Sequence, residues 1–227
     1  MIPLPPRLKL VVFDCDGTLV DSQHSIIACM AAAWRAFGLD APPTAASVRR
    51  VVGLPLVESI ARLHPAGTGA DHLALADCYK QAFHALRRGG PEEEPLFPGV
   101  RETVGYLAKA GVFLGIATGK GRRGLSVTLS RHDLMEFFVT RQTADDAPGK
   151  PHPGMLLQAM AETGAAPEET VMVGDTTFDM MMARNAGVPA IGAAWGYHEP
   201  AELREAGAEV VIPSCADLLS VLPEVME

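Results

Sequence analysis

The stretch that most constrains the fold of this chain is Leu8–Asp21, which reads LKLVVFDCDGTLVD. Its apolar run, Leu8–Phe13, contains β-branched residues and is long enough for one buried strand. The run ends in two carboxylates, Asp14 and Asp16, and in open α/β sheets the functional groups gather at the carboxyl ends of the strands. The stretch therefore predicts a buried strand of an α/β sheet that ends in an acidic site.

Two carboxylates one residue apart at the end of a strand have two interpretations. They can converge on one divalent cation, and one of them can attack an electrophile while the other moves a proton. Gly17 would then permit a tight turn and leave backbone N–H groups free to bind an anion. Asp-x-Asp-Gly is also a common turn sequence, so this stretch alone leaves the choice open.

The composition of the chain narrows the class of protein. Its 227 residues are enough for one large α/β domain or for a core with a smaller second domain. With 48% hydrophobic and 20% charged residues, it has the composition of an ordinary globular protein. The formal net charge of −8 argues against binding to nucleic acid or to an anionic membrane surface.

Cysteine usage and the N-terminal residues bear on the cellular compartment. The 4 cysteines are far apart and form no Cys-x-x-Cys pair, which indicates free thiols in a reducing compartment. Cys15 lies between the two acids, but alternation along an extended segment turns its side chain away from them, which predicts a buried thiol. The first residues include prolines where a signal peptide needs an apolar helix, and no apolar run is long enough to span a membrane. We therefore expect a cytoplasmic protein that binds no membrane.

From residue 22 to residue 90 the periodicity is that of helices. Apolar residues recur at helical spacing over 26–37, and Gly38 is placed to end that helix. Asp71 is a candidate N-cap for a second long helix. Nothing in this segment alternates with period two over a convincing length, so we predict an all-helical domain at residues 21–95.

From Gly99 onward the chain alternates between helices and strands. Strands are predicted at 112–117, 137–140, 170–173, 188–192 and 209–212. Repeated β-α units imply a mostly parallel sheet covered by helices on both faces. We therefore predict an α/β fold with a Rossmann-like, three-layer parallel-sheet core, formed by residues 1–20 and 96–227, into which the α-helical domain is inserted.

Three of the predicted strands end in polar residues. Asp14 and Asp16 follow the first strand, and Thr118 and Asp175 follow two later ones. Because parallel strands place their carboxyl ends along one edge of the sheet, these side chains can meet. Thr118 and Gly119 would offer a hydroxyl and backbone N–H groups to an anion at this edge.

Two further residues can join the same group. Asp179 follows Asp175 by one helical turn, so it can support a cation or act as a charge at a helix N-terminus, and both interpretations stay open. Lys150 lies in a segment stiffened by prolines and can pair there with a carboxylate and with substrate oxygens. Together these residues fit a phosphoryl-transfer site, in which carboxylates hold a hard cation and one carboxylate attacks in line.

The sequence resembles the haloacid dehalogenase-like (HAD) hydrolase superfamily. FDCDGTLVDS is similar to its first motif, IATGK to its second, the lysine of GKPHP to its third and GDTTFD to its fourth, in matching order across essentially the full chain. The helical insertion is similar to the small cap that closes over the site in this superfamily. The resemblance implies a Mg²⁺-dependent phosphatase that acts on a small phosphorylated metabolite.

The resemblance also implies a role for each matching residue. Asp14 would be the nucleophile that becomes an aspartyl-phosphate, and Asp16 the general acid and then the general base. Thr118 and Lys150 would bind the transferring phosphoryl group. The implied Mg²⁺ ligands are Asp14, the main-chain carbonyl of Asp16, and Asp175, with Asp179 in support. Because the dehalogenases of the superfamily lack the second aspartate, Asp16 favours hydrolysis of phosphate esters.

Within the superfamily, VVGLPL in the helical segment and AAWGY at Ala193–Tyr197 are similar to the phosphoglycolate phosphatase-like branch. Arg49 and Arg50 precede VVGLPL, where a cation that faces the site would select an anionic substrate. The alternative is that both arginines are solvated. Gly119 stands where many relatives have asparagine, so we expect only its backbone to contribute to substrate binding.

Two other functions stay open at this stage. A phosphosugar mutase of the same superfamily would share the aspartyl-phosphate, but mutases that resemble this chain carry a histidine where Ile26 stands. A non-catalytic metal- or phosphate-binding regulatory module is disfavoured by the complete set of carboxylates and lysine. The sequence does not identify the physiological substrate, and both a monomer and a homodimer are compatible with it.

Overall fold

The structure is a computed structural model that describes residues 4–88 and 94–226. Its strands form one 6-stranded parallel sheet in the order β3-β2-β1-β4-β5-β6. The strands are β1 (Leu10–Phe13), β2 (Phe113–Thr118), β3 (Phe138–Thr143), β4 (Thr170–Gly174), β5 (Ala190–Ala193) and β6 (Val210–Ile212). Strand β1 pairs with both β2 and β4, so the prediction that the first strand shares a sheet with the later ones is confirmed.

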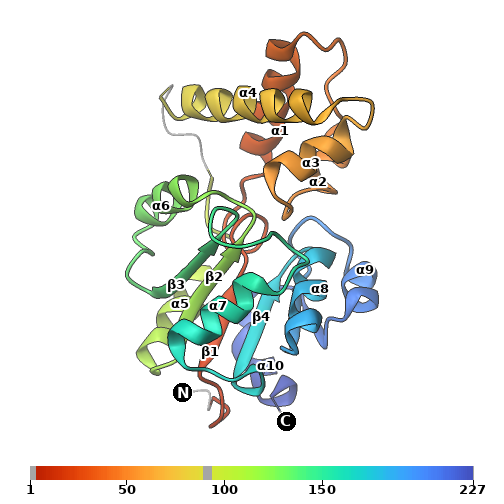
Figure 1. Ribbon diagram of the computed structural model, residues 1–227. Coiled ribbons are helices and arrows are strands. Elements are labelled where there is room, and N and C mark those ends of the chain that lie inside the picture. Colours follow the sequence, from red (N-terminus) through yellow and green to blue (C-terminus); the bar gives the residue numbers. More distant parts are fainter. Residues whose placement is uncertain (1–3, 89–93, 227) are drawn as a thin grey trace.

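Alternating side chains divide the two faces of this sheet. Val11 and Phe13 of β1 belong to one apolar cluster, and Leu10 and Val12 belong to the other. The first face is covered by α5 (Val100–Lys109), α6 (Arg122–Arg131) and α10 (Leu218–Val225), and the second by α7 (Gly154–Thr163), α8 (Thr177–Ala186) and α9 (Pro200–Ala206). Two short 3₁₀ helices, Pro167–Glu169 and Cys215–Asp217, complete these layers. This is the predicted three-layer α/β arrangement (Figure 1).

Four helices form a separate block, called the cap below. They are α1 (Gln23–Phe37), α2 (Ala45–Arg49), α3 (Leu56–Leu63) and α4 (Gly69–Arg88). The apolar side chains of α1 recur every four residues at Ile26, Met30 and Trp34, and they pack in one cluster with Ile60 and Leu75. Figure 1 shows the cap above the edge at which the central strands end. The cap therefore stands over the predicted site.

The two chain segments that connect the cap to the sheet pair with each other. The Asp21 N–H donates to the Pro95 carbonyl at 2.9 Å, and the Phe97 N–H donates to the Leu19 carbonyl at 3.0 Å. The division into a core and a cap at residues 20/21 and 95/96 stays a prediction, and these hydrogen bonds lie at that division. Residues 1–3, 89–93 and 227 belong to the predicted domains but lie outside the described residues.

The local start of helix α4 differs from the sequence prediction. Helix α4 begins at Gly69, so the prediction of Asp71 as its N-cap is wrong. Thr68 precedes the helix, and its hydroxyl oxygen accepts from the Asp71 N–H at 3.3 Å. The Asp71 carboxylate in turn accepts from the Thr68 N–H at 2.8 Å, which is the reciprocal arrangement of a capping box.

Among the described residues, no helix combines the length and the apolar character that crossing a bilayer requires.

Truncation of a core side chain tests the assigned layers. Leu114 of β2 is fully buried in the first-face cluster. Leu114→Ala should lower the free energy of unfolding by about 2–5 kcal/mol, because it removes buried methylene groups and leaves a cavity. Urea denaturation measures this change. Leu157→Ala on α7 is the matched control, because its side chain is 48% exposed and its loss should change stability by less than about 0.5 kcal/mol. Equal losses in the two variants would contradict the assigned packing.

Candidate active site

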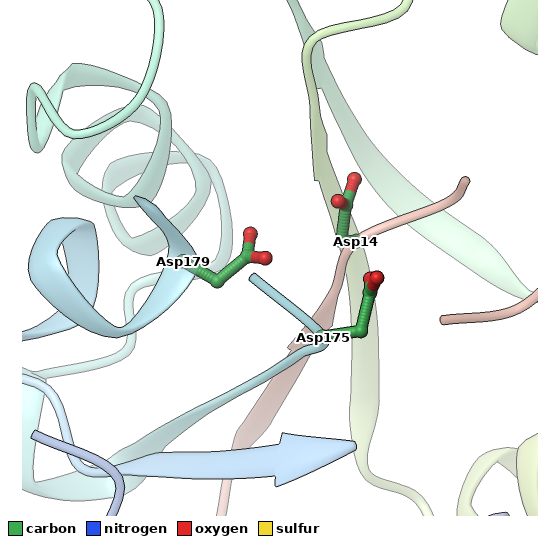
Figure 2. Close-up of side chains that lie close together, drawn as sticks. All are labelled: Asp14, Asp175 and Asp179. Carbon is green, nitrogen blue, oxygen red and sulfur yellow. The ribbon is translucent and has the colours of Figure 1, made fainter. Parts of the chain in front are cut away.

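The carboxyl ends of β1 and β4 bring three carboxylates together. Asp14 directly follows β1, Asp175 directly follows β4, and Asp179 lies in the first turn of α8. One carboxylate oxygen from each lies within 4.8 Å of the others, and all three residues are buried (Figure 2). The sheet register brings Asp14 and Asp175 near each other, because Phe13, which precedes Asp14, is the register partner of Val173, which lies two residues before Asp175. The predicted meeting of these residues is therefore observed.

A buried lysine holds this cluster. The Lys150 Nζ lies 2.8 Å from Asp14 Oδ2 and 2.6 Å from Asp179 Oδ1. Lys150 precedes α7 and is fully buried, so its charge depends on these partners. Burial alone would lower the pKa of Lys150, but the attraction of the two carboxylates outweighs it and holds the pKa above its ordinary value. Lys150 therefore stays charged at neutral pH.

One lysine does not balance three carboxylates. Burial raises the pKa of Asp14 to about 7, although Lys150 opposes this shift. Burial, followed by repulsion from Asp14 and Asp179, raises the pKa of Asp175 well above its ordinary value. A divalent cation would supply the missing positive charge, and carboxylate oxygens are the ligands that Mg²⁺ prefers. The donor set of this cluster therefore fits Mg²⁺.

Hydrogen bonds fix the orientation of the Asp175 carboxylate. Its Oδ1 accepts from the Thr18 hydroxyl at 2.7 Å, and its Oδ2 accepts from the Tyr197 N–H at 3.0 Å. Gly17 lies close to this carboxylate with a left-handed backbone (φ 91°), and a Cβ at this position would collide with Asp175 Oδ2. Glycine is therefore required here by backbone conformation and by space.

Asp179 acts at the helix N-terminus, which is one of the two roles that the sequence left open, and its second carboxylate oxygen lies in the acidic cluster. Its Oδ2 accepts from the Thr176 N–H at 3.0 Å and from the Thr176 hydroxyl at 2.6 Å, which caps the start of α8. Its Oδ1 faces Lys150 and belongs to the acidic cluster. The helix cap therefore aims the second oxygen into the site.

The side chain of Asp16 has different surroundings from that of Asp14. Its Oδ1 accepts from the Ser22 hydroxyl at 2.6 Å and lies 2.9 Å from the Lys120 ammonium. It is not part of the group of three clustered carboxylates found among the described residues. Two carboxylates of one motif therefore occupy separate environments, one beside Lys150 and one beside Lys120.

A cavity of about 490 Å³ lies between the cap and the core, and Asp14 and Asp16 both line it. Thr118, the last residue of β2, and Gly119 line it from the sheet edge. The Thr118 hydroxyl oxygen accepts from the Lys120 N–H at 3.2 Å. The predicted nucleophile, the predicted acid and two of the predicted phosphate-binding residues, Thr118 and Gly119, therefore line one cavity, whereas Lys150 and Gly17 are not among its described lining residues.

The cap rests directly on the loop of the second motif. A Cβ at Gly119 would lie 2.7 Å from the Gly53 carbonyl oxygen and 2.8 Å from that of Leu54. Gly149, next to Lys150, is covered in the same way by the Pro55 ring of the cap. Gly119 is therefore needed for the close approach of the cap backbone, which agrees with the prediction that only its own backbone contributes.

Neither of the two predicted cap cations faces the cavity. The Arg49 Nε donates to Gln23 Oε1 at 3.0 Å, and Arg50 forms an ion pair with Glu202 of α9, with an N···O distance of 2.5 Å. Neither Arg49 nor Arg50 is among the described residues that line the cavity. Their predicted contact with substrate stays a prediction without support from this position of the cap.

Four residues of the site were not predicted from the sequence. Thr18 and Ser22 lie in the first motif, Lys120 is the last residue of the second, and Tyr197 ends AAWGY. Lys120 was detectable, because a lysine two residues after a strand-end threonine is placed to reach the same site. Thr18 and Tyr197 contact Asp175 from positions 157 and 22 residues away in the sequence, which no local pattern indicates. Ser22 contacts Asp16 from six residues away, but its sequence position alone does not show where its hydroxyl points.

Comparison with known proteins shows the family of this chain. Residues 11–193 match the family described as haloacid dehalogenase-like hydrolase, and the chain belongs to this family. It is 34% identical to "Probable phosphatase IndB" of Dickeya dadantii, over 92% of this chain and 91% of that protein. It is 32% identical to a phosphoglycolate phosphatase of Pseudomonas putida, over 92% of this chain and 80% of that protein. The crystal structure of a hydrolase from Pseudomonas syringae superposes with a TM-score of 0.84 at 28% identity, covering 96% of this chain and 98% of that one. These findings confirm the predicted enzyme class, a phosphatase of the HAD-like family.

The raised pKa of Asp14 predicts a pH dependence of stability in metal-free protein. The pKa is about 7 in the folded state and near 3.8 in the unfolded state, so between these values the folded state binds more protons. Stability should therefore fall as pH rises from about 4 to about 7. Thermal unfolding in EDTA, compared with Asp14→Asn, isolates this contribution. The wild-type melting temperature should fall more steeply with pH than that of the variant, and parallel curves would contradict the assignment.

Gly119→Ala tests the contact between the cap and the second motif. The new Cβ would displace the Gly53–Leu54 backbone, so kcat/KM for phosphate-ester hydrolysis should fall by about 10- to 100-fold. The control is Gly105→Ala in α5, where an added Cβ meets nothing within 4 Å, and its kcat/KM should match the wild type. An active Gly119→Ala enzyme would show that the cap does not need this approach.

Proposed function

We propose that this protein is a Mg²⁺-dependent phosphatase that hydrolyses a small phosphorylated metabolite through a covalent aspartyl-phosphate on Asp14. The observation that carries this proposal is the separation of two carboxylates from one strand end. Asp14 lies beside Lys150 in the acidic cluster, whereas Asp16 is held by Ser22 and Lys120, and both line one cavity. One environment suits a nucleophile and the other a proton carrier.

The proposed reaction has two steps. In the first, an Asp14 carboxylate oxygen attacks phosphorus, the bond from phosphorus to the leaving oxygen breaks, and Asp16 gives its proton to the departing alkoxide. In the second, Asp16 takes a proton from water, the resulting hydroxide attacks the same phosphorus, and Asp14 is released as a carboxylate with inorganic phosphate. Asp16 ends protonated, ready for the next substrate molecule.

Cations and donors around the cavity support binding of the phosphoryl group. Lys150 carries a charge that the two carboxylates stabilise, and it can bind a phosphoryl oxygen beside Asp14. The Thr118 hydroxyl and the N–H group of Gly119 lie at the same strand end and are the proposed further donors. The Gly17 N–H donates to the Val20 carbonyl at 2.9 Å, so it is not free to bind an anion, contrary to the sequence prediction. These groups offset the repulsion between an acidic protein and an anionic substrate.

Asp14, Asp175 and Asp179 are the proposed residues that hold Mg²⁺, together with the main-chain carbonyl of Asp16. When bound, Mg²⁺ supplies positive charge that offsets the carboxylates and polarises phosphoryl oxygens. The support for this assignment is the fit of the donor set, in which three buried carboxylates lie together and one lysine pairs with two of them, Asp14 and Asp179.

Hydrolysis is favoured over a mutase reaction by one position of the cap. Ile26 is buried in the cap and lines the cavity, where the mutases that resemble this chain would supply a histidine. An isoleucine side chain neither donates nor accepts a proton, so the cap offers no such group to a sugar hydroxyl at that position. Transfer to water is therefore the proposed outcome.

The proposal is tested by release of inorganic phosphate from a panel of small phosphate esters, including phosphoglycolate. The wild type should hydrolyse one or more esters with Mg²⁺, and EDTA should remove the activity. Asp14→Asn should reduce turnover to background because the nucleophile is lost, and Asp16→Asn should reduce it by about 10²- to 10⁴-fold. Circular dichroism establishes that both variants are folded. Undiminished turnover in folded Asp14→Asn would rule out the mechanism.

A further inference from the structure

The cavity between cap and core is larger and more apolar than a two-carbon leaving group requires. Its volume of about 490 Å³ lies within the range of pockets that hold drug-sized ligands, roughly 300–1,000 Å³. Apart from the reactive end, apolar side chains dominate its walls. They include Ile26 and Met30 of α1, Val51 and Leu54 from the segment between α2 and α3, and Tyr79 and Phe83 of α4. A leaving group as small as glycolate would leave most of this wall uncovered.

Helix α4 presents an aromatic and cationic stripe to this cavity. Tyr79, Phe83 and Arg87 are four residues apart, so they share one face of the helix, and all three line the cavity. The Arg87 guanidinium carbon lies 4.7 Å from the centroid of the Phe83 ring. The Lys120 ammonium lies 5.6 Å from the same centroid. Because Lys120 pairs with Asp16, a continuous chain of contacts joins the proposed acid to Arg87.

Arg87 differs from the neighbouring lysines in its pairing. Lys80 pairs with Asp77, and Lys120 pairs with Asp16. In the described part of the chain, no carboxylate lies within ion-pair distance of Arg87. The Arg87 Nε is buried and has no hydrogen-bond partner. A buried donor without an acceptor is costly, so this guanidinium is placed to receive an acceptor from a ligand in the cavity.

We propose that the leaving group of the substrate carries a second anionic group, such as a carboxylate, which Arg87 binds. An apolar or aromatic body between this anion and the phosphoryl group packs against Tyr79 and Phe83. The inference rests on the proposed function and names the substrate class of the same site. It assigns the selecting cation to α4 and not to Arg49 or Arg50. Arginine suits this task because its planar fork binds a carboxylate through two hydrogen bonds while its face stacks on a ring.

Four esters of primary alcohols separate the two features of the leaving group. Ethyl phosphate has neither feature, phosphoglycolate has only the carboxylate, benzyl phosphate has only the apolar body, and 4-carboxybenzyl phosphate has both. All four keep a CH₂–O–P linkage, which makes their intrinsic reactivities similar. We expect the highest kcat/KM for 4-carboxybenzyl phosphate. The test is the ratio of kcat/KM for 4-carboxybenzyl phosphate to kcat/KM for benzyl phosphate. In Arg87→Gln, this ratio should fall by about tenfold or more.

Control variants separate a direct contact from a general effect of charge. Arg35→Gln removes an exposed cation of α1 that does not line the cavity, so the ratio should equal that of the wild type. Arg87→Lys keeps the charge but loses the planar fork, so its ratio should lie between those of Arg87→Gln and the wild type. An equal fall in Arg35→Gln and Arg87→Gln would overturn the inference, because net charge alone would then explain it.

A binding measurement separates failure of this inference from failure of the proposed function. In Asp14→Asn with Mg²⁺, calorimetry should show tighter binding of 4-carboxybenzyl phosphate than of benzyl phosphate, and Arg87→Gln in the same background should abolish the difference. If no ester is hydrolysed by the wild type but this preference is found, the proposed function fails and the inference stands. If esters are hydrolysed but Arg87→Gln changes the ratio in neither turnover nor binding, the inference is overturned and the proposed function stands.

Discussion

The structure depends on the ion pairs that Lys150 makes with Asp14 and Asp179 in a buried site. Removing such charges from water costs several kcal/mol for each ion, so they are tolerated only when their partners are held in place. The partners come from β1, from the start of α8 and from the loop before α7, which are far apart in the chain. A parallel sheet solves this problem, because it delivers the ends of adjacent strands to one edge. The sheet therefore acts as the support for a cluster that no local segment could hold.

The same edge also carries the contact between core and cap. The cap backbone at Gly53–Leu54 lies on Gly119, and Pro55 lies on Gly149, so the two loops that carry the proposed phosphate-binding residues are both in contact with the cap. The ion pair between Arg50 and Glu202 holds the cap on α9 as well. Movement of the cap would change the surroundings of Thr118 and Lys150 together. Under the proposed function, the fit of a leaving group in the cavity would therefore be linked to the geometry of Thr118 and Lys150.

Whether a strand or helix could be predicted from the sequence depends on whether a local sequence pattern or packing between distant segments forms it. Strands β1 and β4 were predictable because each is an apolar run that ends in an aspartate. Strand β3 runs to Thr143 and is longer than predicted, because its polar end, Arg141–Thr143, is paired with β2 and gives no apolar signal. Helices α9 and α10 were not placed from the sequence. Short helices such as these depend on packing against the sheet more than on their own periodicity.

The site shows the same contrast between motif residues and cap residues. Asp14, Thr118 and Asp175 stand at strand ends, where topology fixes their position once the strands are recognised. A charged residue of a cap helix has no such constraint, because its direction depends on how the helix is rotated against its neighbours. Arg50 precedes a recognisable motif yet pairs with Glu202, 152 positions away, whereas Arg87 carries no motif and faces the cavity beside Phe83. Sequence motifs thus indicate the enzyme class of this chain, whereas the side chains that the cap turns toward the cavity depend on the orientation of its helices.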